Sequence, residues 1–225
     1  VNTKALEDAR YVRLYNAGND TQKVTISKFD VTYAFIGEKA VESDFAQNSS
    51  AEDLRATGKV NNLFDGNLAT SGKITGTQDA GKKIVFDLGQ TVDFKSFRYY
   101  MKETSVDFLR HAKFEVADRK DAPDNEWTKI LEVGNAGAAN LPSSTTAKDV
   151  DYLKHDTTNP GNMYAEAAGL SASGRYLRIV PLTTYTERWV ELYELQINSG
   201  AYMTTESNRD VVSEVTEEAG KIPSN

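Results

Sequence analysis

Alternating apolar and polar positions dominate the middle of the chain. Apolar side chains occupy every second position in residues 84–88, 97–101 and 114–116. An alternation of period two is typical of strands that bury one face. It predicts a set of residues that point into a common core: Ile84, Phe86, Leu88, Phe97, Tyr99, Phe114, Val116, Leu195 and Ile197.

Two further strand-like runs, RYLRIV and VELYELQIN, lie near residues 175–180 and 190–198, and Gly, Asn, Asp and Pro punctuate the gaps between runs. Residues 135–174 are rich in Ala, Ser, Thr, Asn and Gly, which predicts long loops with one weak strand near residues 150–153. No amphipathic helical pattern separates the strands. The expected fold class is therefore all-β, an antiparallel β-sandwich with long loops.

The chain also repeats itself at an offset of about 165 residues. ARYVRLYN (9–16) matches GRYLRIVP (174–181), residues 26–34 match residues 192–200, and TGKVNN (57–62) echoes AGKIPSN (219–225). A period of this length is the size of a domain. We expect the end of one unit in residues 1–37, a complete unit in residues 38–199, and a linker with the start of a third unit in residues 200–225.

Composition limits the possible functions. The chain of 225 residues contains no cysteine, which excludes disulfides and thiol chemistry. Its formal net charge of −7 argues against binding nucleic acid or anionic membranes, because both need a basic face. No apolar run approaches the roughly 20 residues of a membrane span. No signal peptide is visible, so the chain is either cytosolic or the mature or excised part of an exported protein.

The segment NNLFDGNLAT (61–70) holds one carboxylate among many turn-forming residues. It is either a plain turn or half of a metal site whose other half lies elsewhere in the chain.

Five segments in order carry a resemblance to a known family: VNNLFDGNLAT, GKKIVFDLGQTVDFKSFRYY, KFEVADRKDAPDNEWTKI, SGRYLRIVPL and WVELYELQI. Together they resemble the discoidin fold, also called the coagulation factor 5/8 type C domain, over residues 38–199. The bacterial branch of this family is the family 32 carbohydrate-binding module. VDFLRHAKFEVA is most similar to the modules that follow the catalytic domain in secreted bacterial β-N-acetylglucosaminidases and hyaluronidases. The resemblance implies a discoidin-like jelly roll from a secreted or cell-surface bacterial protein.

The resemblance also implies a structural Ca²⁺ site. The positions that carry over are Phe64, Asp65, Asn67, Thr70, Tyr193 and Glu194. Calcium prefers six to eight oxygen ligands in flexible geometry, and a sharp turn at Gly66 would aim carbonyls inward. Glu194 is otherwise a charge in the middle of a strand. The alternative is an Asx-type turn with no metal. Lys28 occupies the equivalent of Glu194 in the first, partial unit, which is therefore expected to lack the site.

Sugar binding in this fold would use loops at one end of the sandwich, with an aromatic face and side chains that bind hydroxyls. The candidates are Arg110, His111, Tyr185, Trp189 and Thr75. Each has a structural alternative: Trp189 as a core residue, Arg110 as a surface ion pair with Asp107, His111 as a solvated loop residue. Galactose-binding members carry a large residue where Ser71–Lys73 stand here. Either another sugar such as N-acetylglucosamine is preferred, or binding has been lost.

Three other functions compete with carbohydrate binding: catalysis, membrane binding and a structural role. Glu191 and Glu194 would lie on opposite faces of a strand and cannot flank one glycosidic bond. Motifs of hydrolases and phosphate-binding enzymes are absent from the sequence. Membrane binding would need basic loop tips, and a structural spacer or docking module needs no ligand. The sequence thus predicts a non-catalytic, calcium-stabilised carbohydrate-binding module, a monomer whose partners are a glycan and neighbouring modules. Its parent would be a glycosidase acting on host glycans that contain N-acetylglucosamine or resemble hyaluronan.

Overall fold

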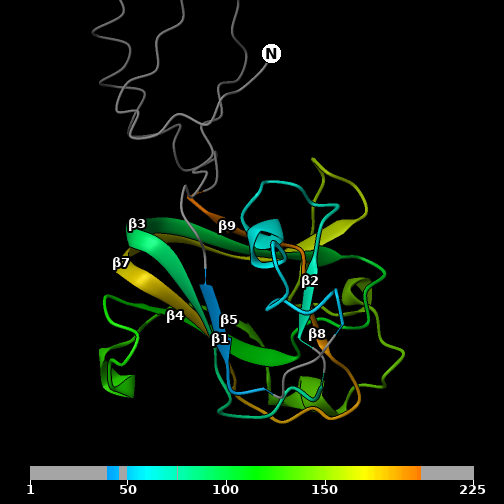
Figure 1. Ribbon diagram of the computed structural model, residues 1–225. Helices are drawn as coiled ribbons and strands as arrows, with labels where there is room; N and C mark the ends of the chain where they lie inside the picture. The colour runs from blue at the N-terminus through cyan, green and yellow to red at the C-terminus, as the bar shows by residue number, and fades with distance from the viewer. Residues whose placement is uncertain (1–39, 46–49, 75, 199–225) are drawn as a thin grey trace, which may run out of the picture.

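The computed structural model describes residues 40–45, 50–74 and 76–198 (Figure 1). All strand pairings in this part of the chain are antiparallel, as expected. The main sheet has the order β1-β3-β7-β4-β5, with β9 beside β3 and β6 beside β7, and β2 pairs with β8 in a second, small sheet. The strands are β1 (Ala40–Ser43), β2 (Gly72–Ile74), β3 (Ile84–Lys102), β4 (His111–Ala117), β5 (Thr128–Gly134), β6 (Lys154–His155), β7 (Asn162–Pro181), β8 (Val190–Leu192) and β9 (Glu194–Ile197).

Helical structure in the described residues is limited to single 3₁₀ turns within the loops. They are η1 (Val60–Leu63), η2 (Asp124–Glu126), η3 (Ala136–Asn140) and η4 (Ala147–Asp149). No helix in this part of the chain is long and apolar enough to cross a membrane. The expectation of an all-β sandwich is confirmed.

Strands β3 and β7 are the two longest strands and form the central ladder of the main sheet. They contain 19 and 20 residues and pair from Ile84 opposite Ile179 to Lys102 opposite Asn162. Two register shifts, after Asp87 and after Phe94, interrupt the ladder. Such bulges bend and twist strands, which is how so long a pair fits a compact domain.

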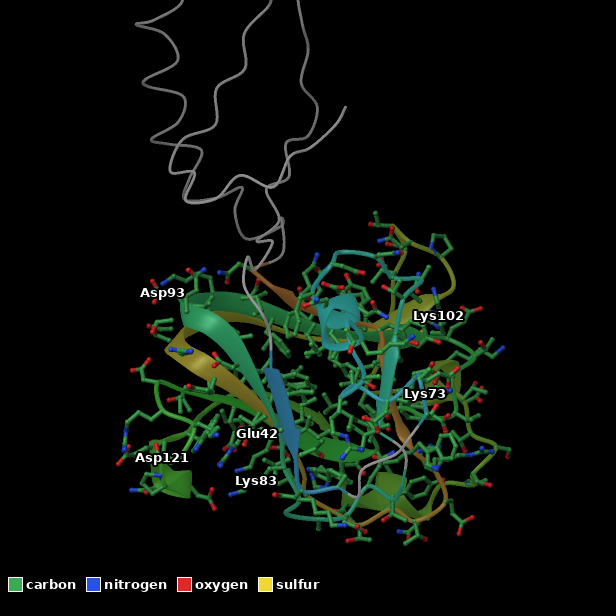
Figure 2. All side chains as sticks on the ribbon, in the orientation of Figure 1. Glu42, Lys73, Lys83, Asp93, Lys102 and Asp121 are labelled. Atoms are coloured by element: carbon green, nitrogen blue, oxygen red, sulfur yellow. The ribbon has the colours of Figure 1, made fainter. Side chains whose placement is uncertain are left out.

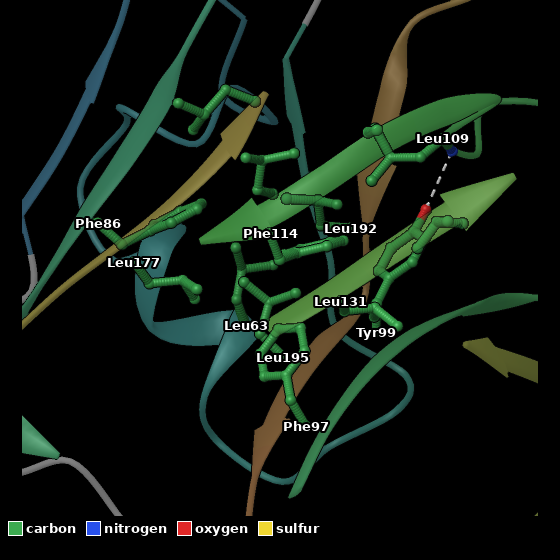
Figure 3. Packing of buried hydrophobic residues seen from close by; sticks show 14 of the residues in the cluster. Leu63, Phe86, Phe97, Tyr99, Leu109, Phe114, Leu131, Leu177, Leu192 and Leu195 are labelled. Atoms are coloured by element: carbon green, nitrogen blue, oxygen red, sulfur yellow. Dashed lines mark hydrogen bonds between the residues drawn. The ribbon is translucent and has the colours of Figure 1, made fainter. Parts of the chain in front are cut away.

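The hydrophobic core confirms the predicted alternation. None of the nine residues expected inside is more than 3% exposed. Phe114 is central, because its ring centroid lies 5.1 Å from that of Phe97 and 5.6 Å from that of Tyr99. The Tyr99 hydroxyl accepts a hydrogen bond from the Leu109 N–H at 3.3 Å (Figure 3). Burial of this phenol raises its pKa, so it stays neutral.

The interpretation of residues 135–174 as loops is wrong at its C-terminal end. Strand β7 begins at Asn162 rather than near Arg175, and the weak strand predicted at residues 150–153 is absent, with the two-residue β6 following it. Alanine and serine have low strand propensity. However, β3 pairs with most of residues 162–179, and that tertiary pairing overrides the local preference.

A buried charge network covers the outer face of the sheet, which the sequence patterns did not indicate. Arg178 on β7 is 2% exposed and binds the carboxylates of Glu115 at 2.7 Å and Asp124 at 2.8 Å. Its guanidinium also stacks 4.2 Å from the centroid of a Trp127 ring. Hydrogen bonds from Lys83 and Arg178 lower the pKa of Asp124 to about 2. Arg178 and Lys83 therefore hold the η2 loop against the sheet.

The predicted division into units is not tested by the structure. The described residues fall within the complete unit expected at 38–199. Residues 1–37 and 200–225, including Lys28, lie outside the described residues, so the neighbouring units remain predictions.

Replacing Phe86 tests the facing assignment of β3. Phe86→Ala removes a fully buried ring, and transfer and cavity contributions together are expected to lower the free energy of unfolding by about 3–5 kcal/mol. The matched control Lys95→Ala, exposed on the same strand, should change it by less than about 0.5 kcal/mol. A loss below about 1 kcal/mol for Phe86→Ala in urea melts would contradict the assignment.

Candidate functional site

The loop at residues 64–70 is a series of local turns. Gly66 adopts φ +73°, in the left-handed region that favours glycine, and marks the sharp turn expected there. The Asn67 N–H donates to the Asp65 carboxylate at 2.8 Å, and the Ala69 N–H donates to the Asn67 side-chain oxygen at 3.0 Å. These bonds are Asx turns, so the loop holds this shape through its own side chains.

The Thr70 hydroxyl stands at the centre of a group of oxygens. It lies 3.0 Å from Asp65 Oδ2, 2.9 Å from the Asn67 carbonyl and 3.4 Å from the Asn62 carbonyl. A hydroxyl has one proton to donate. The loop therefore gathers more acceptor oxygens than Thr70 can satisfy at one time, which is the arrangement that a cation would complete.

Glu194 approaches this loop from the far end of the unit. Its carboxylate oxygen Oε2 accepts the Gly66 N–H at 3.2 Å, although the two residues are 128 positions apart. The side chain is buried, because β9 pairs Glu194 with Tyr100 on β3. The structure thus brings together the two halves that the sequence pattern proposed.

The remaining predicted metal ligands lie on either side of this contact. Phe64 is buried with its ring edge-on to Phe86, at a centroid distance of 6.0 Å, and this packing anchors the start of the loop. Tyr193 occupies the break between β8 and β9, where its N–H donates to the Tyr100 carbonyl at 3.3 Å. Burial raises the pKa of Tyr193 to about 12.

The donor chemistry fits calcium rather than zinc. The two carboxylates, the Thr70 hydroxyl and the neighbouring carbonyls are hard oxygen donors. In the described residues, no group of three or more His, Cys, Asp or Glu side chains could hold a metal. Zinc sites use nitrogen and sulfur ligands.

The loops at residues 76–83, 103–110 and 182–189 meet at one end of the sandwich, which we call the loop-end region. A buried glutamine that was not predicted from the sequence organises this region. The Gln78 side chain is 1% exposed, and its amide nitrogen donates to the Phe108 and Trp189 carbonyls, both at 3.0 Å. Its amide oxygen accepts the Arg110 N–H at 3.1 Å, and its backbone forms an antiparallel bridge with Tyr185. One side chain therefore ties together three loops. Gln78 sits in a loop with no periodic pattern, so nothing in the sequence indicated its burial.

Arg110 is not on the rim of this region, contrary to expectation. Its side chain is 0% exposed, and its guanidinium lies between the rings of Phe108 and Tyr185, at 4.1 and 4.7 Å from their centroids. Nη2 donates to the Val106 and Thr145 carbonyls, both at 3.3 Å. Burial lowers the pKa of the guanidinium from its ordinary value. Arg110 packs the loops from within, and neither a sugar nor an ion pair with Asp107 accounts for its position.

The other sugar-site candidates divide into buried and exposed residues. Tyr185 is buried beneath Arg110, and His111 is the first residue of β4 rather than a solvated loop residue. The His111 ring contacts the Thr183 hydroxyl at 2.8 Å and the Glu132 carboxylate at 3.4 Å. Trp189 is 45% exposed, so it is a rim residue and not a core residue. Thr75 lies outside the described residues.

The acidic pair considered for catalysis is separated. Glu191 on β8 lies 3.7 Å from Lys73 and accepts a hydrogen bond from the Ser71 hydroxyl at 3.1 Å. Glu194 on β9 instead contacts Gly66. The two carboxylates therefore serve different parts of the structure, and Ser71 and Lys73 both contact Glu191 on β8.

The described residues define a class of fold, an antiparallel β-sandwich with a cluster of loops tied together at one end. The family model "F5/8 type C domain" matches residues 45–195, which is more than half of the chain, and the chain belongs to this family. Domains of this family are non-catalytic, in agreement with the prediction that the chain is not an enzyme. A comparison with curated proteins gave no match.

Three of the solved structures to which this chain is similar have low sequence identity to it. Chitosan-binding module 2 of a chitosanase/glucanase from Paenibacillus sp. IK-5, in complex with chitotriose, is 14% identical with a TM-score of 0.44, covering 73% of this chain and 98% of that one. CpGH89CBM32-5 from Clostridium perfringens, in complex with GalNAc-β-1,3-galactose, is 13% identical with a TM-score of 0.43, covering 71% and 94%. A fucolectin from striped bass (Morone saxatilis) is 16% identical with a TM-score of 0.45, covering 72% and 45%.

Removing the Gln78 amide tests its role in the loop-end region. Gln78→Leu leaves two carbonyls and one N–H without their partner, and buried unsatisfied groups cost about 1–3 kcal/mol each. We expect a loss of about 2–4 kcal/mol in unfolding free energy and a change in iodide quenching of Trp189. Gln90→Leu, at an exposed position within β3, is the matched control and should alter neither quantity. Wild-type stability and quenching in Gln78→Leu would refute the assignment.

Proposed function

We propose that this domain is a non-catalytic carbohydrate-binding module whose sugar site lies at the loop end, centred on Trp189. The observation that carries the proposal is the large exposed indole on a backbone fixed by Gln78. A sugar ring stacks its C–H face on such an aromatic surface. Because the supporting loops are already ordered, binding would cost little conformational entropy.

The polar partner at this site is Arg188 rather than Arg110. Arg188 is half-buried beside Trp189, and its Nε donates to the Ser143 carbonyl at 2.8 Å. That bond uses one of the five N–H donors of the guanidinium, so the remaining donors are available for sugar hydroxyls. The exposed Glu187 supplies an acceptor in the same loop.

The sugar proposed is one that contains N-acetylglucosamine or resembles hyaluronan. Support comes from the resemblance of VDFLRHAKFEVA to modules of secreted bacterial β-N-acetylglucosaminidases and hyaluronidases. The absence of a large residue at Ser71–Lys73 agrees with a sugar other than galactose. On this proposal the domain belongs to a secreted or cell-surface bacterial glycosidase and brings that enzyme to host glycans.

We also propose that Ca²⁺ binds between the loop at residues 64–70 and β9. Asp65, Glu194 and the Thr70 hydroxyl would hold it, together with the carbonyls of Phe64, Asn67 and Tyr193. The ion would supply positive charge that links the loop to the strand. Phe64 and Gly66 already position the loop, and β9 already orients Glu194, so little rearrangement of the chain is needed.

Glycan binding is tested first on an array and then by calorimetry. Trp189→Ala should weaken the affinity for the best array ligand at least tenfold, because the stacking surface is lost. Leu182→Ala, which removes another exposed apolar side chain, should leave it within twofold. Failure to bind any array glycan would instead favour the alternative, a structural spacer or docking module.

Calcium is tested by thermal unfolding with and without chelator. At free calcium a hundredfold above Kd, stabilisation is about 2.7 kcal/mol, and 1 kcal/mol shifts the Tm of a domain this size by about 2–4 °C. Chelator should therefore lower Tm by about 5–10 °C. Asp65→Asn and Glu194→Gln should each abolish this shift, with little further loss in the double variant because both act through one ion.

The control for the calcium experiment is Trp189→Ala, which should keep the full chelator response. If metal-free wild-type protein, verified by elemental analysis, melts at the same temperature with and without added calcium, the loop is an ordinary set of Asx turns.

A further inference from the structure

A cavity lies on the outer face of the sheet, away from the loop-end site. Its volume is about 390 Å³, within the range of roughly 300–1,000 Å³ typical of small-molecule sites. The floor is formed by Tyr100 and Lys102 of β3 and by Glu194 and Gln196 of β9. These residues alternate with the core residues of the same strands, so they face outward.

Two loops form the walls of this cavity. Residues 66–69 bound it on one side, and the turn that carries Asn159 and leads into Asn162 bounds it on the other. Figure 1 shows these segments, in cyan and in yellow-green, on the same side of the sheet. Lys102, labelled in Figure 2, is the last residue of β3. The cavity therefore lies at the end of the β3–β7 ladder where β7 begins.

The second wall is held rigidly. The Asp156 carboxylate is 6% exposed and accepts the N–H groups of Thr158 at 2.9 Å and Asn159 at 3.1 Å, together with the Asn159 amide nitrogen at 2.8 Å. Asn162 donates to the Asn159 carbonyl and accepts a bond from Lys102 Nζ, both at 2.8 Å. A wall fixed in this way is preorganised for a ligand.

The lining offers both hydrogen-bond donors and hydrogen-bond acceptors. Lys102 has three N–H donors, of which Asn162 takes one. Asn67 uses its side-chain oxygen on Ala69 and keeps an NH₂ group, whereas Asn159 uses its NH₂ group on Asp156 and keeps an oxygen. Gln196 adds a further amide, whose oxygen has no hydrogen-bond partner within the described part of the chain.

The charged side chains of the lining limit which class of ligand the cavity could bind. Lys102 contributes one positive charge to the lining and Glu194 one negative charge, so the lining is close to neutral. A polyanion would find one cationic side chain in this lining, Lys102, and an apolar ligand would leave the amides unsatisfied. Hydroxyl groups, each both donor and acceptor, can bond with a lining that mixes amide donors and amide acceptors. We propose that this cavity is a second carbohydrate subsite that takes a neutral sugar residue through its hydroxyls.

The subsite is tested by NMR titration of the ¹⁵N-labelled chain with N-acetylglucosamine, galactose and glucuronic acid, each to 100 mM. With at least one neutral sugar, the Asn67 and Gln196 side-chain amides and the Gly66 N–H should shift saturably. The same shifts and the same Kd are expected in Trp189→Ala, because the loop-end site shares no lining residue with the cavity. Lys102→Gln and Gln196→Met should each weaken this binding at least fivefold with Tm unchanged.

Lys95→Gln is the matched control, the same substitution on an exposed position of the same strand, and it should leave Kd unchanged. Absence of saturable shifts with both neutral sugars, whether or not glucuronic acid binds, would overturn the proposal. Shifts that vanish in Trp189→Ala would also overturn it, because they would then be transmitted from the loop end. Shifts at the cavity without any at the Trp189 indole would support the second subsite and reject the proposed loop-end function.

Discussion

The antiparallel ladder between β3 and β7 positions every other part of this domain. On the free edge of β3, β1 pairs with its first residues and β9 with its last, while β4 occupies the free edge of β7. The two ends of the ladder therefore present different surroundings. The loop-end site follows the end of β7, and the cavity of the outer face lies where β7 begins. The β3–β7 pairing thus keeps the two potential binding surfaces apart, although both are built on the same hydrophobic core.

Two strand carboxylates illustrate how the fold manages buried charge. A buried carboxylate is costly unless it is paired or bound. Glu115 is neutralised by Arg178 from the neighbouring strand and by Lys113 at 2.6 Å. Glu194 accepts the Gly66 N–H at 3.2 Å, so its carboxylate is held against the loop at residues 64–70. The proposed cation would bind at this contact, between the strand carboxylate and the oxygens of the loop.

The period of apolar positions predicted the core residues of strands that alternate. It did not predict the strands that form because of tertiary contacts. Phe86, Tyr99 and Phe114 were found because burying one strand face leaves a period of two in the sequence. The first half of β7 was missed because its small residues have weak strand propensity, and only the β3 partner makes them a strand. Family resemblance located Asp65 and Glu194, whose contact spans the whole unit and has no local signature.

Arg110 shows the limit of reading chemistry from residue type. An arginine after a strand is a reasonable sugar ligand, yet two aromatic rings from different loops enclose this one. Phe108 is only two positions from Arg110 in the sequence, but nothing in the sequence alone places Tyr185 beside Arg110. Gln78 is a second example, because a polar loop residue is buried and hydrogen-bonds with two other loops. Trp189, by contrast, remained exposed because its backbone, and not its ring, is what Gln78 holds.

The proposed calcium centre and the outer-face cavity share residues 66–69 and Glu194, and this has a thermodynamic consequence. An ion that orders the loop also orders one wall of the cavity, so a sugar bound there would meet a smaller entropic cost. By linkage, a sugar in the cavity must then strengthen ion binding by the same factor. The loop-end site is held by Gln78 and Arg110 instead, whose side chains bond with the loops around residues 106–110, 145 and 189. Coupling to calcium should therefore distinguish the two surfaces, even when both accept the same sugar.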